Sequence, residues 1–410
     1  MEENSYKNSE TAPPIMQGAP PPIEQRLPFI DWDRPPWNRW SFQRVSEFLP
    51  TALIRKGKVV SPLQYSLIDI SDIEVKGPSG EVSNINQFIE DTYTDGFLIM
   101  HNGKVIHETY YNGMDERTLH LCQSVSKSIC ATAGASLIEE GLLDPNELVT
   151  NYLPELSQTG WKGATLQHVL DMTSGVKFVE TYEDRECDIG KMDFASGWKP
   201  APEGVDVSKW PKNIWDQILS LRVKEVEHGE RHEYRSIETD IFAHARERVT
   251  GKRLPQIVSE RLWAPMGAEE DANITVDSNG YGLACGGVSA SLRDLARFAD
   301  VMLNEGMSSG KQVVPISWIK DVRHGKHGMR IKQYFDHGIY RNQFWVEDSE
   351  IGSHYCLGVF GQLIYVNPQS NMVAVKLSTF PTFRDELFTK YTMIALQEIA
   401  KQLNSKMKFK

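Results

Sequence analysis

The feature that most constrains the fold is a pair of hairpin patterns placed near opposite ends of the chain. In the first, Phe97–His101 and Lys104–Tyr111 flank Asn102-Gly103, the dipeptide best suited to a two-residue type I′ turn. In the second, Gln362–Val366 and Met372–Ser378 flank a polar turn. Because isolated hairpins need neighbours to bury their apolar faces, we expect one sheet built from both chain ends.

Helical patterns follow each hairpin. Apolar residues recur at helical spacing over 124–140, and Gly141 then supplies a left-handed stop. A terminal amphipathic helix is predicted over 385–403. No internal repeat is found. The sequence therefore predicts an α+β fold with a mostly antiparallel sheet flanked by helices.

The chain divides into three predicted parts. We expect residues 31–160 and 251–410 to form one α/β sheet domain. Irregular short helices and long loops over 161–250 indicate an inserted helical subdomain that carries lid loops. Residues 1–30 are rich in proline and polar residues and are predicted to be a disordered tail.

Charge and hydropathy restrict the partners. The 410 residues hold 44 Lys and Arg against 55 Asp and Glu, a net charge of -11, which disfavours nucleic acid and anionic membranes. The sequence has no run of about 18 apolar residues, so no membrane helix is predicted. The first residues lack a secretory signal pattern. We therefore expect a cytoplasmic protein that binds neither nucleic acid nor membrane.

Signatures of cofactors and metals are missing from the sequence. The five cysteines are scattered without a Cys-x-x-Cys pair, which favours reduced thiols. His228 and His232 flank a glycine and have no third ligand nearby, so a surface loop is favoured over a metal site. No phosphate-binding glycine motif follows a strand. The sequence therefore predicts no cofactor and no metal.

Two serine motifs are candidates for the site of a nucleophile. Gly306–Gly310 fits Gly-x-Ser-x-Gly, but a helical run precedes it and strand-like residues follow, the reverse of a nucleophile elbow, so a connecting turn is predicted. Ser-x-x-Lys occurs six times, and only Ser124–Lys127 opens a long apolar helix. There the helix dipole favours a developing oxyanion. Burial and the same helix end are expected to lower the pKa of Lys127 so that a neutral amine can act as base. An N-capping serine with a solvated lysine is the alternative.

Tyr234 is the candidate third member of the site. It lies in Tyr234-Arg-Ser236, just before a helical run that ends at Gly251. A phenol close to a lysine can relay a proton, which suits a Ser-Lys pair. Simple packing of the ring before a helix is the alternative.

Together with these motifs, short sequence segments through most of the chain resemble the 6-aminohexanoate-dimer hydrolases, a branch of the β-lactamase-related serine hydrolases. The wider superfamily shares Gly141-Leu-Leu-Asp, Tyr152-Leu-Pro-Glu and Met172-Thr-Ser-Gly175, whereas the tryptophan-rich segment from Pro36 and Asp91-Thr-Tyr-Thr-Asp95 are restricted to the branch. The resemblance implies a β-lactamase/transpeptidase-like fold with a cleft between sheet and helical region.

The same resemblance implies roles for single residues. Ser124 would be the acylated nucleophile, Lys127 its base, and Tyr234 the acid for the leaving amine. The backbone amides of Ser124 and Val359 would form the oxyanion hole. Tyr182 would hydrogen-bond the scissile amide, and Asp193 would face the ammonium end of the substrate, with an exposed loop acid as the alternative for Asp193.

Three positions depart from the relatives. Cys356 stands where penicillin-binding relatives carry a lysine for the β-lactam carboxylate, which argues against tight β-lactam recognition. Phe360 replaces a histidine, and Cys285 replaces a polar side chain near the substrate, so both are assigned to substrate binding. These changes concern the substrate more than the chemistry.

The function predicted from the sequence is hydrolysis of a linear, 6-aminohexanoate-dimer-like amide through an acyl-enzyme at a Ser-Lys-Tyr site. The partner is a small amide or ester, and a homodimer is conceivable for a scaffold of this size. A carboxylesterase of the same fold is one alternative. A non-catalytic binding or sensing module is another, since scaffolds of this kind can lose turnover.

Overall fold

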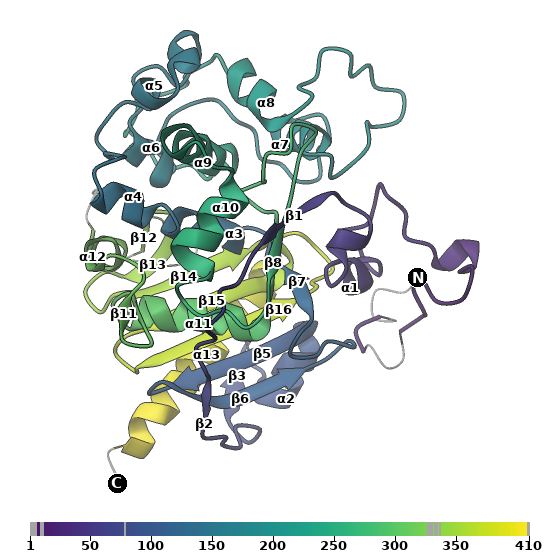
Figure 1. The fold of residues 1–410 in the computed structure, drawn as a ribbon. Coiled ribbons are helices and arrows are strands. Elements are labelled where there is room, and N and C mark those ends of the chain that lie inside the picture. The colour runs from purple at the N-terminus through teal and green to yellow at the C-terminus, as the bar shows by residue number, and fades with distance from the viewer. Residues whose placement is uncertain are drawn as a thin grey trace.

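The computed structural model describes residues 6–8, 12–77, 79–325, 331, 335 and 338–407. Its centre is an eight-stranded sheet with helices on both faces, and an all-helical region lies beyond one face (Figure 1). The predicted α+β class is confirmed.

Both predicted hairpins lie next to each other in the central sheet. The strand order is β12 (Ile339–Arg341), β13 (Phe344–Asp348), β14 (Ser353–Gly358), β15 (Gln362–Asn367), β16 (Met372–Ser378), β5 (Thr94–His101), β6 (Lys104–Tyr110) and β2 (Gln64–Tyr65). All neighbours pair antiparallel except β2 with β6. The first hairpin meets the second where β5 pairs with β16, so one sheet is indeed built from both chain ends.

The turn of the first hairpin has the predicted geometry. Asn102 and Gly103 have φ of 50° and 72°, as a type I′ turn requires at both central positions. Strand β5 alternates its buried side chains between two apolar cores, with Leu98 on one face and Phe97 and Ile99 on the other. Each fully buried side chain of this size contributes about 1.5–3 kcal/mol. Burial of both faces explains why the strand reads as a continuous apolar run.

Helices cover the two faces of the central sheet. Helix α11 (Leu292–Leu303) packs on β5, β15 and β16. The opposite core holds α2 (Ile85–Asp91) and α13 (Glu386–Met407), the predicted terminal helix, next to the short hairpin β3 (Glu74–Lys76) and β4 (Val82–Asn84). Both chain ends therefore supply cover as well as strands.

A second, four-stranded sheet was not predicted. Its order is β1 (Thr51–Ile54), β8 (Ala272–Thr275), β9 (Val288–Ser291) and β7 (Leu119–Leu121). All three pairings are antiparallel, and the β1–β8 and β7–β9 pairings join segments far apart in the chain. Strands of three or four residues are too short to give a clear alternating pattern.

The helical region packs around one central helix. This helix is α9 (Ile237–Thr250), and it contacts α3 (Val125–Thr132), α5 (Val149–Tyr152), α6 (Leu166–Leu170), α8 (Ile214–Ser220) and α10 (Leu254–Val258). Helix α5 lies before residue 161, so helical packing begins earlier than the predicted subdomain. The exact domain boundaries stay a prediction.

The helix predicted over 124–140 is divided into α3 and α4 (Ala135–Glu139). At the break, a Cβ atom on Gly134 would lie 2.8 Å from side-chain atoms of Phe242 and Arg246, so only glycine allows α9 to approach this closely. Gly141 ends the second piece with φ of 72°, as predicted.

The remaining elements are short. They are α1 (Asn38–Ser41), α7 (Asp188–Ala195), α12 (Ile316–His324), the hairpin of β10 (Met307–Ser308) and β11 (Lys311–Gln312), a π-helical turn η4 (Ser259–Trp263) and the 3-10 turns η1 (Ile23–Gln25), η2 (Val45–Glu47), η3 (Pro154–Gln158) and η5 (Val359–Gly361). The β10–β11 hairpin contains Gly306–Gly310 at its turn, which confirms a connecting turn there.

A buried ionic network fastens the tryptophan-rich segment to the sheet. Arg39 donates to Asp95 Oδ1 at 2.9 Å, and the other Asp95 oxygen lies 3.1 Å from His120 Nε2 and accepts from Thr379 at 3.0 Å. Asp95 is fully buried, so this set of partners compensates the cost of removing its charge from water.

Part of the predicted disordered tail has a defined path. Residues 1–5 and 9–11 lie outside the described residues. Tyr6 is 3% exposed and packs on Tyr93 with ring centroids 5.8 Å apart, and η1 follows at Ile23–Gln25. The structure differs from the prediction because buried aromatic contact offsets part of the ordering entropy of this segment.

In the described part of the chain, none of the helices combines the length and apolar character needed to span a membrane.

Candidate active site

Ser124 lies at a strand–turn–helix junction. Strand β7 ends at Leu121, Gln123 takes a left-handed backbone conformation with φ of 49°, and α3 begins at Val125. Such a conformation in a non-glycine residue is held by its surroundings and often lies beside functional groups. The Ser124 side chain makes no capping hydrogen bond to α3. The alternative of an N-capping serine is therefore wrong.

Lys127 lies one turn along α3 and directs its amine at Ser124. Its Nζ atom donates to Ser124 Oγ at 2.9 Å and to the backbone carbonyl of Cys285 at 2.6 Å. The side chain is 1% exposed, so the alternative of a solvated lysine is also wrong. Spacing of i and i+3 on a helix puts both groups on one face, at a distance suited to proton transfer.

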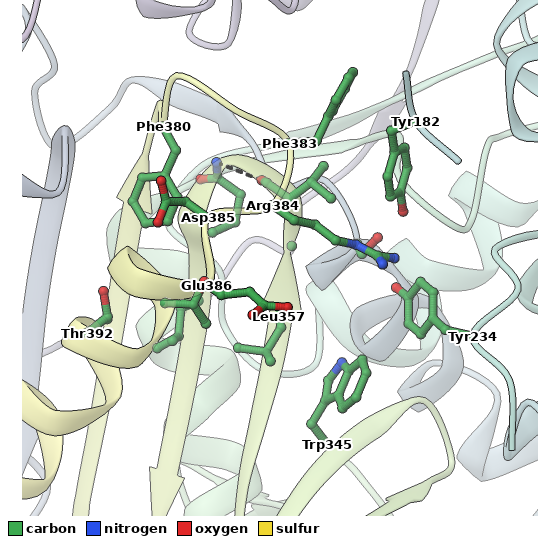
Figure 2. Close-up of a pocket in the computed structure, with 17 residues that line it drawn as sticks. Tyr182, Tyr234, Trp345, Leu357, Phe380, Phe383, Arg384, Asp385, Glu386 and Thr392 are labelled. Atoms are coloured by element: carbon green, nitrogen blue, oxygen red, sulfur yellow. Dashed lines mark hydrogen bonds between the residues drawn. The ribbon is translucent and has the colours of Figure 1, made fainter. Parts of the chain in front are cut away.

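Tyr234 approaches this pair from the segment before α9. The Lys127 Nζ atom lies 5.1 Å from the centroid of the Tyr234 ring. The ring stacks on Trp345 of β13 with centroids 5.5 Å apart, and Figure 2 shows both rings at the wall of one cavity. The structure therefore brings Ser124, Lys127 and Tyr234 together, and the ring of Tyr234 is packed as well.

The charge state of the lysine differs from the prediction. Burial lowers the pKa of Lys127, but the charges that Tyr234 and Cys285 carry when ionised, together with the Glu180 carboxylate, raise it, and the net direction is upward. Burial also raises the pKa of Tyr234, against the effect of the Lys127 charge. Both shifts therefore disfavour loss of a proton from Lys127 or Tyr234. The predicted lowering considered burial and the helix end but not the acidic neighbours.

Two cavities meet at Ser124. The first, here called the Arg384 cavity, has a volume of about 690 Å³ and is also lined by Tyr234 (Figure 2). The second, the Asp193 cavity, has a volume of about 530 Å³. Four residues line both cavities: Ser124, Tyr182, Val359 and Phe383. A linear substrate can therefore extend from the nucleophile in two directions.

The end of β14 lies against the amide of Ser124. A Cβ atom on Gly358 would lie 2.7 Å from the carbonyl oxygen of Cys122 and 3.1 Å from the Ser124 nitrogen. Only glycine permits this approach. Val359 follows directly and lines both cavities. This placement favours the predicted pair of oxyanion donors, Ser124 and Val359, which stays a prediction.

Tyr182 lies between the two cavities. Its ring stacks on Phe383 with centroids 5.2 Å apart, and the guanidinium of Arg384 lies 5.0 Å from the ring centroid. Its hydroxyl donates to Glu180. Glu180 also accepts from the backbone nitrogen of Ser236 at 2.7 Å and from its hydroxyl at 2.8 Å. Glu180 thus joins the Tyr182 loop to the start of α9.

Asp193 is on α7 and lines the cavity named after it. Burial raises its pKa to about 7. Lys199 acts against this rise and the carboxylate of Asp33 adds to it. The alternative of an exposed loop acid does not fit this placement, and the substrate role of Asp193 stays a prediction.

The two departing positions that were assigned to substrate binding are placed differently. Cys285 lines the Asp193 cavity, and burial raises the pKa of its thiol well above the ordinary value. Phe360 is not among the described residues that line either cavity. Its backbone φ of 61° turns the ring into the core, between Phe42 and Phe383 at centroid distances of 5.3 and 4.7 Å. Phe360 therefore supports the cavity wall through Phe383, and its assignment to direct substrate contact is corrected.

The structure also shows the surroundings of His228, which was predicted to lie in a surface loop. Its ring nitrogens contact the backbone carbonyls of Ser174 and Lys162. Over the residues that the structure describes, no group of three or more His, Cys, Asp or Glu side chains could hold a metal ion.

Sequence reasoning missed several residues in or beside the two cavities. Glu180, Trp345 and Arg384 carry no motif, because a single charged or aromatic residue in a loop has many ordinary explanations. Asp33, which the sequence analysis did not single out, also lines the Asp193 cavity. A carboxylate inside an aromatic segment, next to Trp32, was the available signal.

Comparisons with known proteins identify the family of this chain. The sequence matches the Beta-lactamase family over residues 84–397. It is 35% identical over 360 residues to the 6-aminohexanoate-dimer hydrolase of Paenarthrobacter ureafaciens, covering 86% of this chain and 88% of that protein. The solved "Putative 6-aminohexanoate-dimer hydrolase from Bacillus anthracis" has a TM-score of 0.83 at 28% identity, covering 94% of this chain and 99% of that one. A family VIII carboxylesterase, with a TM-score of 0.56 at 16% identity over 76% of this chain and 97% of that one, shares the fold alone.

Proposed function

Because the chain belongs to the Beta-lactamase family, in the branch of the 6-aminohexanoate-dimer hydrolases, we propose that this serine hydrolase cleaves linear amides resembling the 6-aminohexanoate dimer. The observation that carries the proposal is the 2.9 Å contact between Lys127 Nζ and Ser124 Oγ at the junction of two cavities. Its family membership makes the protein an enzyme, so the alternative of a non-catalytic binding module is dropped.

The proposed reaction passes through an acyl-enzyme. Ser124 Oγ attacks the carbonyl carbon of the amide while its proton passes to the neutral amine form of Lys127. The amides of Ser124 and Val359 stabilise the oxyanion. Tyr234 then donates its proton to the leaving nitrogen as the C–N bond breaks, and it recovers a proton from Lys127. Water attacks the Ser124 ester through the reverse proton transfers and releases the acid.

The two cavities suggest an orientation for the substrate. Tyr234 lines the Arg384 cavity and Asp193 lines the other. A leaving amine protonated by Tyr234 would lie in the Arg384 cavity, so the acyl part would extend into the Asp193 cavity. Asp193 is then placed to face an ammonium at the far end of the acyl chain.

Active-site labelling tests the proposed nucleophile. A fluorophosphonate should modify Ser124 alone, as mapped by mass spectrometry, and Ser124→Ala should abolish labelling and hydrolysis because the proposed reaction has no other nucleophile. The matched control is Ser126→Ala on the same helix. Rates on a p-nitrophenyl ester and on the 6-aminohexanoate dimer separate an esterase from an amidase. Labelling at any other residue contradicts the proposal.

Asp193 should affect ammonium-terminated substrates selectively. We expect Asp193→Asn to lower kcat/KM for 6-aminohexanoyl-p-nitroanilide by about 10- to 100-fold, the effect of a charge-assisted hydrogen bond, and to leave the uncharged heptanoyl-p-nitroanilide nearly unchanged. In the wild type, the ratio of the two kcat/KM values should rise as pH increases through about 7, where Asp193 ionises. Equal losses on both substrates, or a ratio independent of pH, would refute the ammonium-binding role.

A further inference from the structure

The Asp193 cavity contains a second carboxylate, which comes from the N-terminal segment. Trp32 is fully buried, and its indole nitrogen donates to the backbone carbonyl of Trp198 at 2.7 Å. The two indole rings pack edge to face, 5.4 Å apart. This contact places the next residue, Asp33, in the cavity wall at 4% exposure. The segment therefore reaches the site.

The two oxygens of Asp33 have different surroundings. Oδ2 pairs with the ammonium of Lys199 at 2.8 Å. Oδ1 is buried and has no hydrogen-bond partner in the structure. Such a buried acceptor costs free energy unless a donor reaches it. A purely structural ion pair with Lys199 explains only one of the two oxygens.

The charges around the cavity are arranged asymmetrically. Asp33 and Asp193 are the charged side chains among the described residues that line it. The cations Lys199, Arg34 and Arg185 act on Asp193 from outside that lining. Lys199 is also bound through its backbone, since its nitrogen donates to the carbonyl of Asp193 at 3.1 Å. The two carboxyl groups therefore face the cavity, and these cations lie outside its lining.

Resting on the function proposed above, we propose that Asp33 is a specificity-determining residue whose free Oδ1 accepts a hydrogen bond from the ammonium end of the acyl chain, with Asp193 as the second acceptor. An ammonium carries three donors and can bind both carboxylates at once. A neutral acyl chain would leave Oδ1 without a donor, so the subsite discriminates against it.

The test compares two acyl chains of equal length on matched variants. With 6-aminohexanoyl-p-nitroanilide, Asp33→Asn should raise KM about tenfold or more and change kcat little. With heptanoyl-p-nitroanilide, which carries a methyl group in place of the ammonium, both constants should stay near wild type. Asp31→Asn, the same charge change at an exposed position of the same segment, is the control and should behave as wild type.

Binding of n-hexylammonium, measured by calorimetry and compared with n-hexanol, gives a readout independent of turnover. Asp33→Asn should weaken hexylammonium binding selectively, and Lys199→Met, which frees the second oxygen, should tighten it.

If Asp33→Asn does not fold, the Lys199→Met variant tests the inference instead, and weaker or unchanged hexylammonium binding in that variant overturns it. Equal losses on both anilides, or a wild-type preference in Asp33→Asn, also overturn it. Failure of wild-type protein to hydrolyse either anilide instead contradicts the proposed function, while the binding experiment still tests Asp33.

Discussion

Replacing Lys127 by methionine should lower kcat for a p-nitrophenyl ester by about 10⁴-fold or more, because Ser124 loses its base. When catalytic residues act as one unit, loss of a single member removes most of the catalysis. Methionine keeps most of the buried side-chain volume. The lost hydrogen bonds are those to Ser124 Oγ and to the Cys285 carbonyl. Steady-state kinetics, with circular dichroism to verify folding, measure the effect.

The pH profile gives the same prediction a second readout. Since the pKa of Lys127 is raised, the reacting neutral amine is a minor form at pH 7, and wild-type kcat/KM on an uncharged ester should increase as pH rises above 7. The residual activity of Lys127→Met should lack this increase. Lys162→Met, at an exposed lysine, is the control. Wild-type rates in Lys127→Met would exclude Lys127 as the base.

Local patterns predicted the parts of the fold that depend on neighbours in sequence. The type I′ turn at Asn102-Gly103, the strands beside it and the stop at Gly141 all follow from conformations that few residues adopt. The four-stranded sheet could not be predicted, because β1, β8 and β7 are short and come from distant segments. The division of α3 from α4 depends on contact between Gly134 and α9, which is likewise a tertiary effect.

The candidate site shows the same division between local and tertiary information. Ser124 and Lys127 share one helix turn, so their contact follows from helical spacing. The pKa direction of Lys127 does not, because it depends on Glu180 from a loop and Tyr234 from another segment. Asp33 is similar, since its burial depends on the Trp32 contact with Trp198, more than 160 residues away. Motifs can identify reacting groups, whereas charges and specificity depend on the folded neighbourhood.

Gly358→Ala should lower kcat by about 100- to 1000-fold, the usual effect of losing one oxyanion donor, without unfolding the protein. The added methyl carbon would lie 2.7 Å from the Cys122 carbonyl oxygen and 3.1 Å from the Ser124 nitrogen. Both neighbours are backbone atoms that cannot rotate away, so the end of β14 must move from the Ser124 turn. That movement separates the amides of Ser124 and Val359.

A matched substitution distinguishes this effect from a general disturbance of the sheet. At Gly96 in β5 of the same sheet, an added Cβ atom would meet side-chain rather than backbone atoms, those of Leu292 at 3.2 Å, away from both cavities. Gly96→Ala should therefore retain kcat within a fewfold. Thermal unfolding of both variants, together with kcat and KM on one ester, separates stability from catalysis. If Gly358→Ala keeps wild-type kcat, or if Gly96→Ala loses as much, then the close approach of β14 does not form the oxyanion hole, and Val359 is not its second donor.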